Sequence, residues 1–172
     1  MTKTGDEKPT IAKAITDAGG KAIAVGADVA DEASVNAAVD KVVAELGKPT
    51  VVVNNAGITR DNLLMRMKDE DWQAIIDTNL TSVYRSSKAV MRGMMKARKG
   101  RIVNIASVVG VTGNAGQANY AASKGALTAM AAAGLGGYVV CGINDTRRGE
   151  ALVRDVRRAD CQILITDDAH LG

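Results

Sequence analysis

Three side chains in the second half of the sequence have the types and the spacing to protonate a carbonyl oxygen. Tyr120 follows Ser107 by 13 residues, and Lys124 lies four residues beyond the tyrosine. Residues four apart share one face of a helix, so the phenol and the ammonium are expected to be neighbours. A lysine charge favours the phenolate and lowers the pKa of the phenol, which makes proton donation to a developing alkoxide easier at neutral pH. Ser107 can hydrogen-bond the same oxygen.

The tyrosine–lysine pair is a weak signal by itself, because these two residues occur four apart by chance on many helices. The alternative interpretation is a half-buried tyrosine that is covered by the stem of the lysine. The predicted strands and helices around the pair are needed to distinguish these two interpretations.

Short aliphatic segments alternate with longer helical patterns along the chain, which is typical of an α/β fold with parallel strands. The core has to be aliphatic, because the sequence contains one tryptophan, three tyrosines and no phenylalanine. Ser107 follows a predicted strand at its carboxyl end, where ligands bind in open α/β sheets. We therefore predict a three-layer, Rossmann-like parallel sheet. Strands are expected at residues 21–27, 50–53 and 101–106, and helices at residues 34–46, 72–95 and 119–133.

The composition argues against several classes of protein. The chain has 172 residues, of which 47% are hydrophobic and 24% are charged, and this length and composition are typical of one globular domain. A net charge of +3 is too small for a nucleic-acid-binding surface, and one histidine with two separated cysteines offers almost nothing for a metal site. The polar start and the lack of an apolar stretch of 18 residues predict neither a secretory signal nor a membrane span. We expect a cytoplasmic protein.

Further motifs accompany the serine, tyrosine and lysine in a fixed order along the chain. The set consists of D-V at Asp28 and Val29, N-N-A-G at residues 54–57, Asn79, Ser107, and Y-x-x-x-K at Tyr120 and Lys124. With this set, residues 11–130 resemble the short-chain dehydrogenase/reductase family. Residues 58–68 and 113–120 look like the bacterial 3-oxoacyl-[acyl-carrier-protein] reductases in particular.

The resemblance implies a role for each polar residue of the predicted site. Tyr120 would be the general acid, and Ser107 would orient the substrate carbonyl. Lys124 would hold the nicotinamide ribose and lower the pKa of the tyrosine. Asn79 would anchor a water molecule in a proton relay, and the alternative is an asparagine at a helix kink.

The resemblance also implies where a cofactor and a carrier protein would bind. Asn55, Ala56 and Gly57 would lie along NADPH, whereas Asn54 could simply tie two strands together. Asp28 and Val29 would contact the adenine, although Asp28 could equally be the N-cap of a helix before Glu32. Arg98 and Lys99, in the basic segment 96–101, resemble a docking patch for the acidic carrier protein, and the alternative is a solvated loop.

The function implied by this resemblance is NADPH-dependent reduction of a 3-oxoacyl thioester on acyl carrier protein in fatty-acid biosynthesis. The product is the 3-hydroxyacyl thioester. The family commonly forms homo-oligomers through two long helices, here near residues 72–95 and 119–133. A different class of function is a non-catalytic α/β scaffold in which the catalytic residues are inherited but idle.

Both ends of the sequence depart from the family pattern. No G-x-G-x-x-G or T-G-x-x-x-G-x-G turn occurs, so the sheet is expected to be incomplete at its N-terminal side and cofactor affinity reduced. Residues 135–170 instead resemble a segment of fatty acyl-CoA synthetases, with strands predicted at residues 138–143 and 162–166. We therefore interpret the chain as chimera-like, with residues 1–130 and 131–172 of different origin forming one domain. An unfilled gap would leave the strand at residues 50–53 with an open apolar edge.

Overall fold

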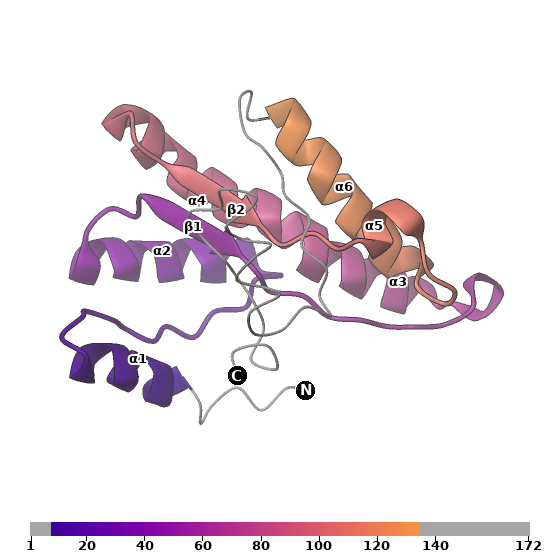
Figure 1. Cartoon of the computed structure of the whole chain (residues 1–172), viewed down its shortest axis with the longest axis horizontal. Coiled ribbons are helices and arrows are strands. Elements are labelled where there is room, and N and C mark those ends of the chain that lie inside the picture. The colour runs from indigo at the N-terminus through magenta and orange to yellow at the C-terminus, as the bar shows by residue number, and fades with distance from the viewer. Residues whose placement is uncertain (1–7, 135–172) are drawn as a thin grey trace.

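A small parallel sheet lies at the centre of the computed structural model, which describes residues 8–134 (Figure 1). Strand β1 (Val51–Asn54) pairs in parallel with β2 (Arg101–Asn104). Val51 lies opposite Arg101, and Asn54 lies opposite Asn104. The predicted strands 50–53 and 101–106 and their parallel arrangement are thus confirmed, each within a few residues.

Helices lie along the sheet and along one another. α4 contacts both β1 and α2, while α3, the π-turn η2 and α5 contact α6. The predicted helices 34–46, 72–95 and 119–133 are confirmed as α2, as α3 to α4, and as α6. The helical elements are α1 (Lys8–Asp17), α2 (Glu32–Leu46), η1 (Leu64–Arg66), α3 (Asp69–Ile76), η2 (Asp77–Thr81), α4 (Ser82–Ala97), α5 (Val109–Thr112) and α6 (Ala118–Gly134).

The start of α2 is fixed by an aspartate that satisfies an unpaired backbone donor. The Asp31 carboxylate accepts a hydrogen bond from the backbone N–H of Ser34 at 2.8 Å. Asp28 is therefore not the N-cap, and that alternative was wrong. Its carboxylate accepts instead from the N–H of Ala30 at 2.9 Å, within the turn that leads into the helix.

The long helix predicted at residues 72–95 is interrupted by the π-turn η2, which joins α3 to α4. Ser82 begins the regular helix again, and its hydroxyl donates to the carbonyl of Thr78 at 2.6 Å. Such wide turns occur mostly singly within helices and frequently at functional sites. The buried positions of this stretch are Ile75, Asn79, Ser82, Val83, Ser87, Val90 and Met94.

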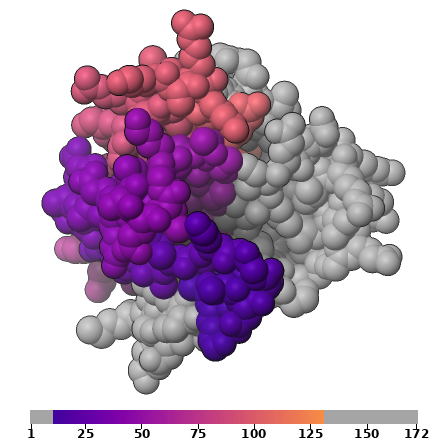
Figure 2. All heavy atoms as spheres, turned by 90° about the vertical axis from the view of Figure 1, so that its left-hand side faces the viewer, coloured from indigo at the N-terminus to yellow at the C-terminus, as the bar shows by residue number. Residues whose placement is uncertain are grey.

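Residues 21–27 do not form the predicted strand. A strand requires a neighbour with which to exchange main-chain hydrogen bonds, and no described strand pairs with this segment. The preceding helix α1 was not predicted, and its Ile11 and Ile15 side chains are 48% and 43% exposed. Figure 2 shows α1 in indigo below the purple residues around α2, on one face of the molecule.

One edge of β1 has no partner strand among residues 8–134, as expected for an incomplete sheet. Val51 and Val53 of this strand are 40% and 37% exposed. The strands predicted at residues 138–143 and 162–166 lie outside the described residues, so their placement stays a prediction. Within the described range, no helix has the length and apolar character needed to cross a membrane.

Candidate active site

Four polar side chains predicted from the sequence lie on segments that meet near the carboxyl ends of β1 and β2. We call Asn79, Ser107, Tyr120 and Lys124 the polar cluster. Three of its members are buried, with exposed fractions of 0% for Asn79 and 4% for both Ser107 and Lys124. The carboxyl ends of parallel strands are where open α/β sheets bind ligands.

Lys124 is the charged centre of the polar cluster. Its Nζ donates to the carbonyl of Ile105 at 2.6 Å, which links α6 to the segment that leads from β2 to Ser107. Burial lowers the pKa of Lys124 from its ordinary 10.5 to about 8. At neutral pH the ammonium is therefore mostly protonated, and it lies 5.7 Å from the centre of the Tyr120 ring.

Asn79 lies in the π-turn and holds the loop that follows β1. Its Oδ1 accepts from the backbone N–H of Ile58 at 2.8 Å, and its Nδ2 donates to the carbonyl of the same residue at 2.9 Å. Nδ2 is also 3.5 Å from the hydroxyl of Ser123 on α6. A kink asparagine, one of the two sequence interpretations, is consistent with this position; the water-anchoring role stays a prediction.

Ser107 ends the segment after β2 and begins the turn of α5. Its Oγ accepts from the backbone N–H of Val109 at 3.3 Å. This bond uses a lone pair of Oγ and not the hydroxyl hydrogen, so Ser107 can still donate that hydrogen to another acceptor. The Ser107 carbonyl accepts in turn from the N–H of Gly110 at 3.0 Å.

Two further buried residues, Asn119 and Ser123, support Tyr120 and were not singled out from the sequence. Asn119 donates from Nδ2 to the carbonyl of Arg60 at 3.0 Å, and its Oδ1 accepts from the N–H of Tyr120 at 2.8 Å. Ser123 donates to the carbonyl of Tyr120 at 2.8 Å. Both residues are 0% exposed. Two polar residues four apart in an alanine-rich helix were the available signal, since such side chains need partners when buried.

The N-N-A-G segment divides into a structural and an open part. Asn54 donates to Oδ1 of Asn104 at 2.7 Å, so it ties β1 to β2 as the sequence alternative proposed. Ala56 and Gly57 are exposed. A Cβ built on Gly57 would lie 3.5 Å from Oδ1 of Asn79 and 3.8 Å from Nζ of Lys124, so this open backbone borders the polar cluster.

The remaining predicted residues lie outside the polar cluster. Asp28 is exposed, and Val29 is partly exposed in the turn before α2. Arg98 and Lys99 are exposed beyond the far end of α4, about 24 Å along the helix from its start. Arg98 adopts a left-handed conformation with φ of 50° and caps the helix through its backbone N–H.

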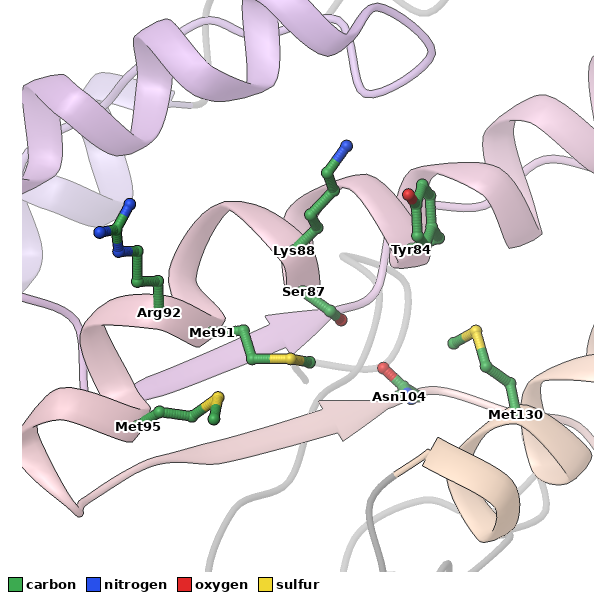
Figure 3. Close-up of a pocket in the computed structure, with 8 residues that line it drawn as sticks. All are labelled: Tyr84, Ser87, Lys88, Met91, Arg92, Met95, Asn104 and Met130. Atoms are coloured by element: carbon green, nitrogen blue, oxygen red, sulfur yellow. The ribbon is translucent and has the colours of Figure 1, made fainter.

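A separate pocket of about 470 Å³ opens between α4 and α6 (Figure 3). It lies over β2, on which Asn104 contributes to its floor, and methionines from both helices form its walls. Its lining residues are Tyr84, Ser87, Lys88, Met91, Arg92, Met95, Asn104 and Met130. None of them belongs to the polar cluster. Elsewhere in residues 8–134, no group of three metal-ligating side chains gathers.

Comparison with known proteins agrees with the α/β fold. The family model described as short chain dehydrogenase matches residues 1–136, beginning ten residues before the resemblance noted in the sequence. The chain belongs to this family of Rossmann-like α/β proteins.

Within this family, the chain is similar to reductases of one kind. The 3-oxoacyl-[acyl-carrier-protein] reductase FabG of Escherichia coli (strain K12) is 60% identical over 119 residues, which is 67% of this chain and 48% of the relative. FabG of Vibrio harveyi is 58% identical over 105 residues, covering 61% of this chain and 42% of the relative. FabG of Pseudomonas aeruginosa is 53% identical over 100 residues, covering 58% and 40%. The chain thus spans about half the length of the curated relatives that it matches. The likeness of residues 135–170 to fatty acyl-CoA synthetases stays a prediction.

Proposed function

We propose that this protein reduces a 3-oxoacyl thioester, carried on acyl carrier protein, to the 3-hydroxyacyl thioester with NADPH. The observation that carries the proposal is the burial of a lysine ammonium beside Tyr120, at the end of the strand that leads to Ser107. The identity to the FabG reductases, whose printed name gives this reaction, supports it.

The roles of the residues follow from their chemistry. Tyr120 gives its phenolic proton to the oxygen of the substrate carbonyl as that oxygen gains negative charge. Ser107 donates a hydrogen bond to the same oxygen and fixes its position. The ammonium of Lys124, 5.7 Å from the ring centre, stabilises the negative charge left on the phenolate. Bound NADPH supplies the hydride that the carbonyl carbon accepts.

The open N-N-A-G backbone fits a flat cofactor beside the polar cluster. Gly57 has no side chain to obstruct access, and its Cβ position lies within 4 Å of both Asn79 and Lys124. Asn55 and Ala56 would lie along the cofactor, Lys124 would hold the nicotinamide ribose, and Asp28 with Val29 would contact the adenine.

Two surfaces are assigned to protein partners under this proposal. Arg98 and Lys99 present exposed positive charge at one end of α4, which suits an acidic carrier protein. Met91, Met95 and Met130 line the pocket between the two long helices, where the resemblance implies self-association. Exposed apolar side chains that gather on one surface often mark such interfaces.

The test is NADPH binding by the full chain, followed by reduction of an acetoacetyl thioester. We expect micromolar binding that is lost in Lys124→Ala and kept in Lys41→Ala, which alters an exposed lysine of α2. Ser107→Ala should retain binding and lose most of the reduction rate, while Thr128→Ala on the exposed side of α6 should reduce normally. A folded chain that fails to bind millimolar NADPH would favour the non-catalytic scaffold instead.

A further inference from the structure

A main-chain contact between α5 and α6 lies directly beside the polar cluster. A Cβ built on Gly110 would lie 2.6 Å from the backbone nitrogen of Gly125 and 2.7 Å from the carbonyl carbon of Lys124. A Cβ on Gly125 would lie 2.8 Å from the carbonyl oxygen of Gly110. Real Cβ atoms essentially never approach other atoms within 3.0 Å. The two segments therefore approach this closely only because both positions are glycine.

Each side of this contact leads to one half of the polar cluster. On α5, Gly110 donates its N–H to the carbonyl of Ser107 at 3.0 Å, so displacing the glycine displaces the serine. On α6, Gly125 directly follows Lys124, and Tyr120 precedes the lysine by one helical turn. The hydrogen bond from Lys124 to Ile105 at 2.6 Å holds the same two segments together from the other side of Ser107.

We propose that Gly110 and Gly125 are a positioning pair, which sets the distance from Ser107 to Tyr120 and Lys124 for the reduction. This inference rests on the proposed function, because it assigns to the contact the geometry that the reaction needs. The atoms that a new Cβ would meet are backbone atoms, which cannot rotate away as the end of a flexible side chain can. An alanine at either position must therefore separate α5 from α6.

Gly110→Ala is the stronger test, and Gly125→Ala is the milder one, because its close approach is to a single atom. A displacement of about 1 Å within an active site can cost roughly 100-fold in rate. We expect kcat for acetoacetyl thioester reduction to fall by about 10- to 100-fold in Gly110→Ala and by less in Gly125→Ala.

Gly100→Ala is the matched control, because its Cβ would lie 2.6 Å from Sδ of Met94, far from the polar cluster along α4. This variant also introduces a steric conflict, but with a side chain. We expect a lower melting temperature with the wild-type kcat for each folded molecule. A purely structural role for Gly110 and Gly125 would give the same result for their variants and would overturn the proposal.

A second measurement does not depend on catalysis. The Lys124 amine can be labelled by reductive methylation with ¹³C-formaldehyde, titrated by NMR and assigned with Lys124→Arg. Separating α5 from α6 admits water to the lysine, so its pKa should rise from about 8 toward 10.5 in Gly110→Ala and stay near 8 in Gly100→Ala.

The two measurements separate failure of this inference from failure of the proposed function. If the wild-type chain reduces no thioester, the proposed function fails while the titration still tests the contact. Wild-type kcat and an unchanged titration in both glycine variants would overturn the positioning role. Unfolding of both variants would also overturn it, because the contact would then serve stability alone.

Discussion

The chain contains two tyrosine–lysine pairs with the same spacing, one on each long helix. Tyr84 and Lys88 lie on α4, and Tyr120 and Lys124 lie on α6. In both pairs the lysine nitrogen is at nearly the same distance from the centre of the ring, 5.5 Å on α4 and 5.7 Å on α6. The local geometry is therefore set by the helix and is shared.

The surroundings of the two lysines are opposite. The Lys88 side chain is 58% exposed and lies 3.3 Å from the carboxylate of Glu32, and its hydrogen bond to that carboxylate raises its pKa above 10.5. Lys124 is buried and contacts a neutral carbonyl, so its pKa falls to about 8. Spacing brings the two groups of each pair together, whereas burial without a counter-ion among residues 8–134 gives the pair on α6 its distinct chemistry.

The largest expected difference between the two tyrosine–lysine pairs is the effect of their mutation on the reduction rate. Tyr120→Phe removes the proposed proton donor, so we expect thioester reduction to fall by about 10²- to 10⁴-fold. Tyr84→Phe makes the same chemical change on an exposed ring and should leave the rate unchanged. Steady-state rates of the two purified variants decide the matter. Equal rates in both would show that the pair on α6 is no more functional than the pair on α4.

The next difference concerns how stability depends on pH. Between pH 8 and 10.5 the unfolded chain keeps the proton that folded Lys124 has lost, so the free energy of unfolding rises with pH. Relative to Lys124→Met, the wild type should gain about 3 kcal/mol across this interval. Urea unfolding of both proteins at several pH values measures the difference, because their other titrating groups are the same.

The difference in the free energy of unfolding between the wild type and Lys88→Met should show no such rise between pH 8 and 10. Because the pKa of Lys88 is raised, its contribution to stability is present below 10.5 and is lost only as the pH rises through the folded-state value. If the wild type gained as much stability relative to Lys88→Met as it gains relative to Lys124→Met, the assignment of opposite environments would be contradicted.

A smaller effect is expected from the residue that closes the loop beside Lys124. Asn79→Ala removes both hydrogen bonds to Ile58 and leaves the partly buried main-chain N–H and carbonyl of that residue without these partners. We expect a loss of about 1–3 kcal/mol in the free energy of unfolding. Asn36→Ala, at an exposed position of α2, is the control and should change stability little. Equal stabilities would show that water replaces Asn79 at no cost.

The smallest effect should come from the ion pair that distinguishes Lys88. Glu32→Gln removes its carboxylate, so the pKa of Lys88 should return toward 10.5, while the free energy of unfolding should change little because the pair is exposed to solvent. NMR titration of the lysine and urea unfolding measure the two quantities. A larger loss of stability would mean that α2 and α4 depend on this pair for their packing.

Much of the frame was predictable because periodic patterns report local structure. The aliphatic segments that became β1 and β2, and the helix that carries Tyr120 and Lys124, were placed within a few residues. The strand predicted at residues 21–27 failed because a strand depends on a neighbour that no local pattern reveals. The sequence leaves Asp28 open as an N-cap of α2, and the structure has Asp31 in that role, because both aspartates have suitable chemistry and only the fold selects between them.

The sequence predicts which residues form the site better than it predicts their pKa values and hydrogen bonds. Spacing indicated Tyr120 and Lys124, but the low pKa of the lysine depends on burial beneath segments distant in sequence. Asn119 and Ser123 are not evident from the sequence because their importance lies in tertiary hydrogen bonds, from Asn119 to Arg60 and from Asn79 to Ser123. The approach of Gly110 to Gly125 is likewise a contact between two helices, and it cannot be predicted from the sequence around either glycine.

The π-turn η2 determines which side chains of α4 lie on the same face as the buried side chains of α3. Ile75, Asn79, Val83 and Ser87 are buried at intervals of four residues. In a regular α-helix each such interval overshoots a full rotation by about 40°, so three intervals would turn the last side chain about 120° away from the first. The extra residue in the wide turn absorbs about 100° of this drift. Deleting one residue from 77–81 would therefore rotate all of α4 relative to α3 and turn Val83 and Ser87 off the buried face.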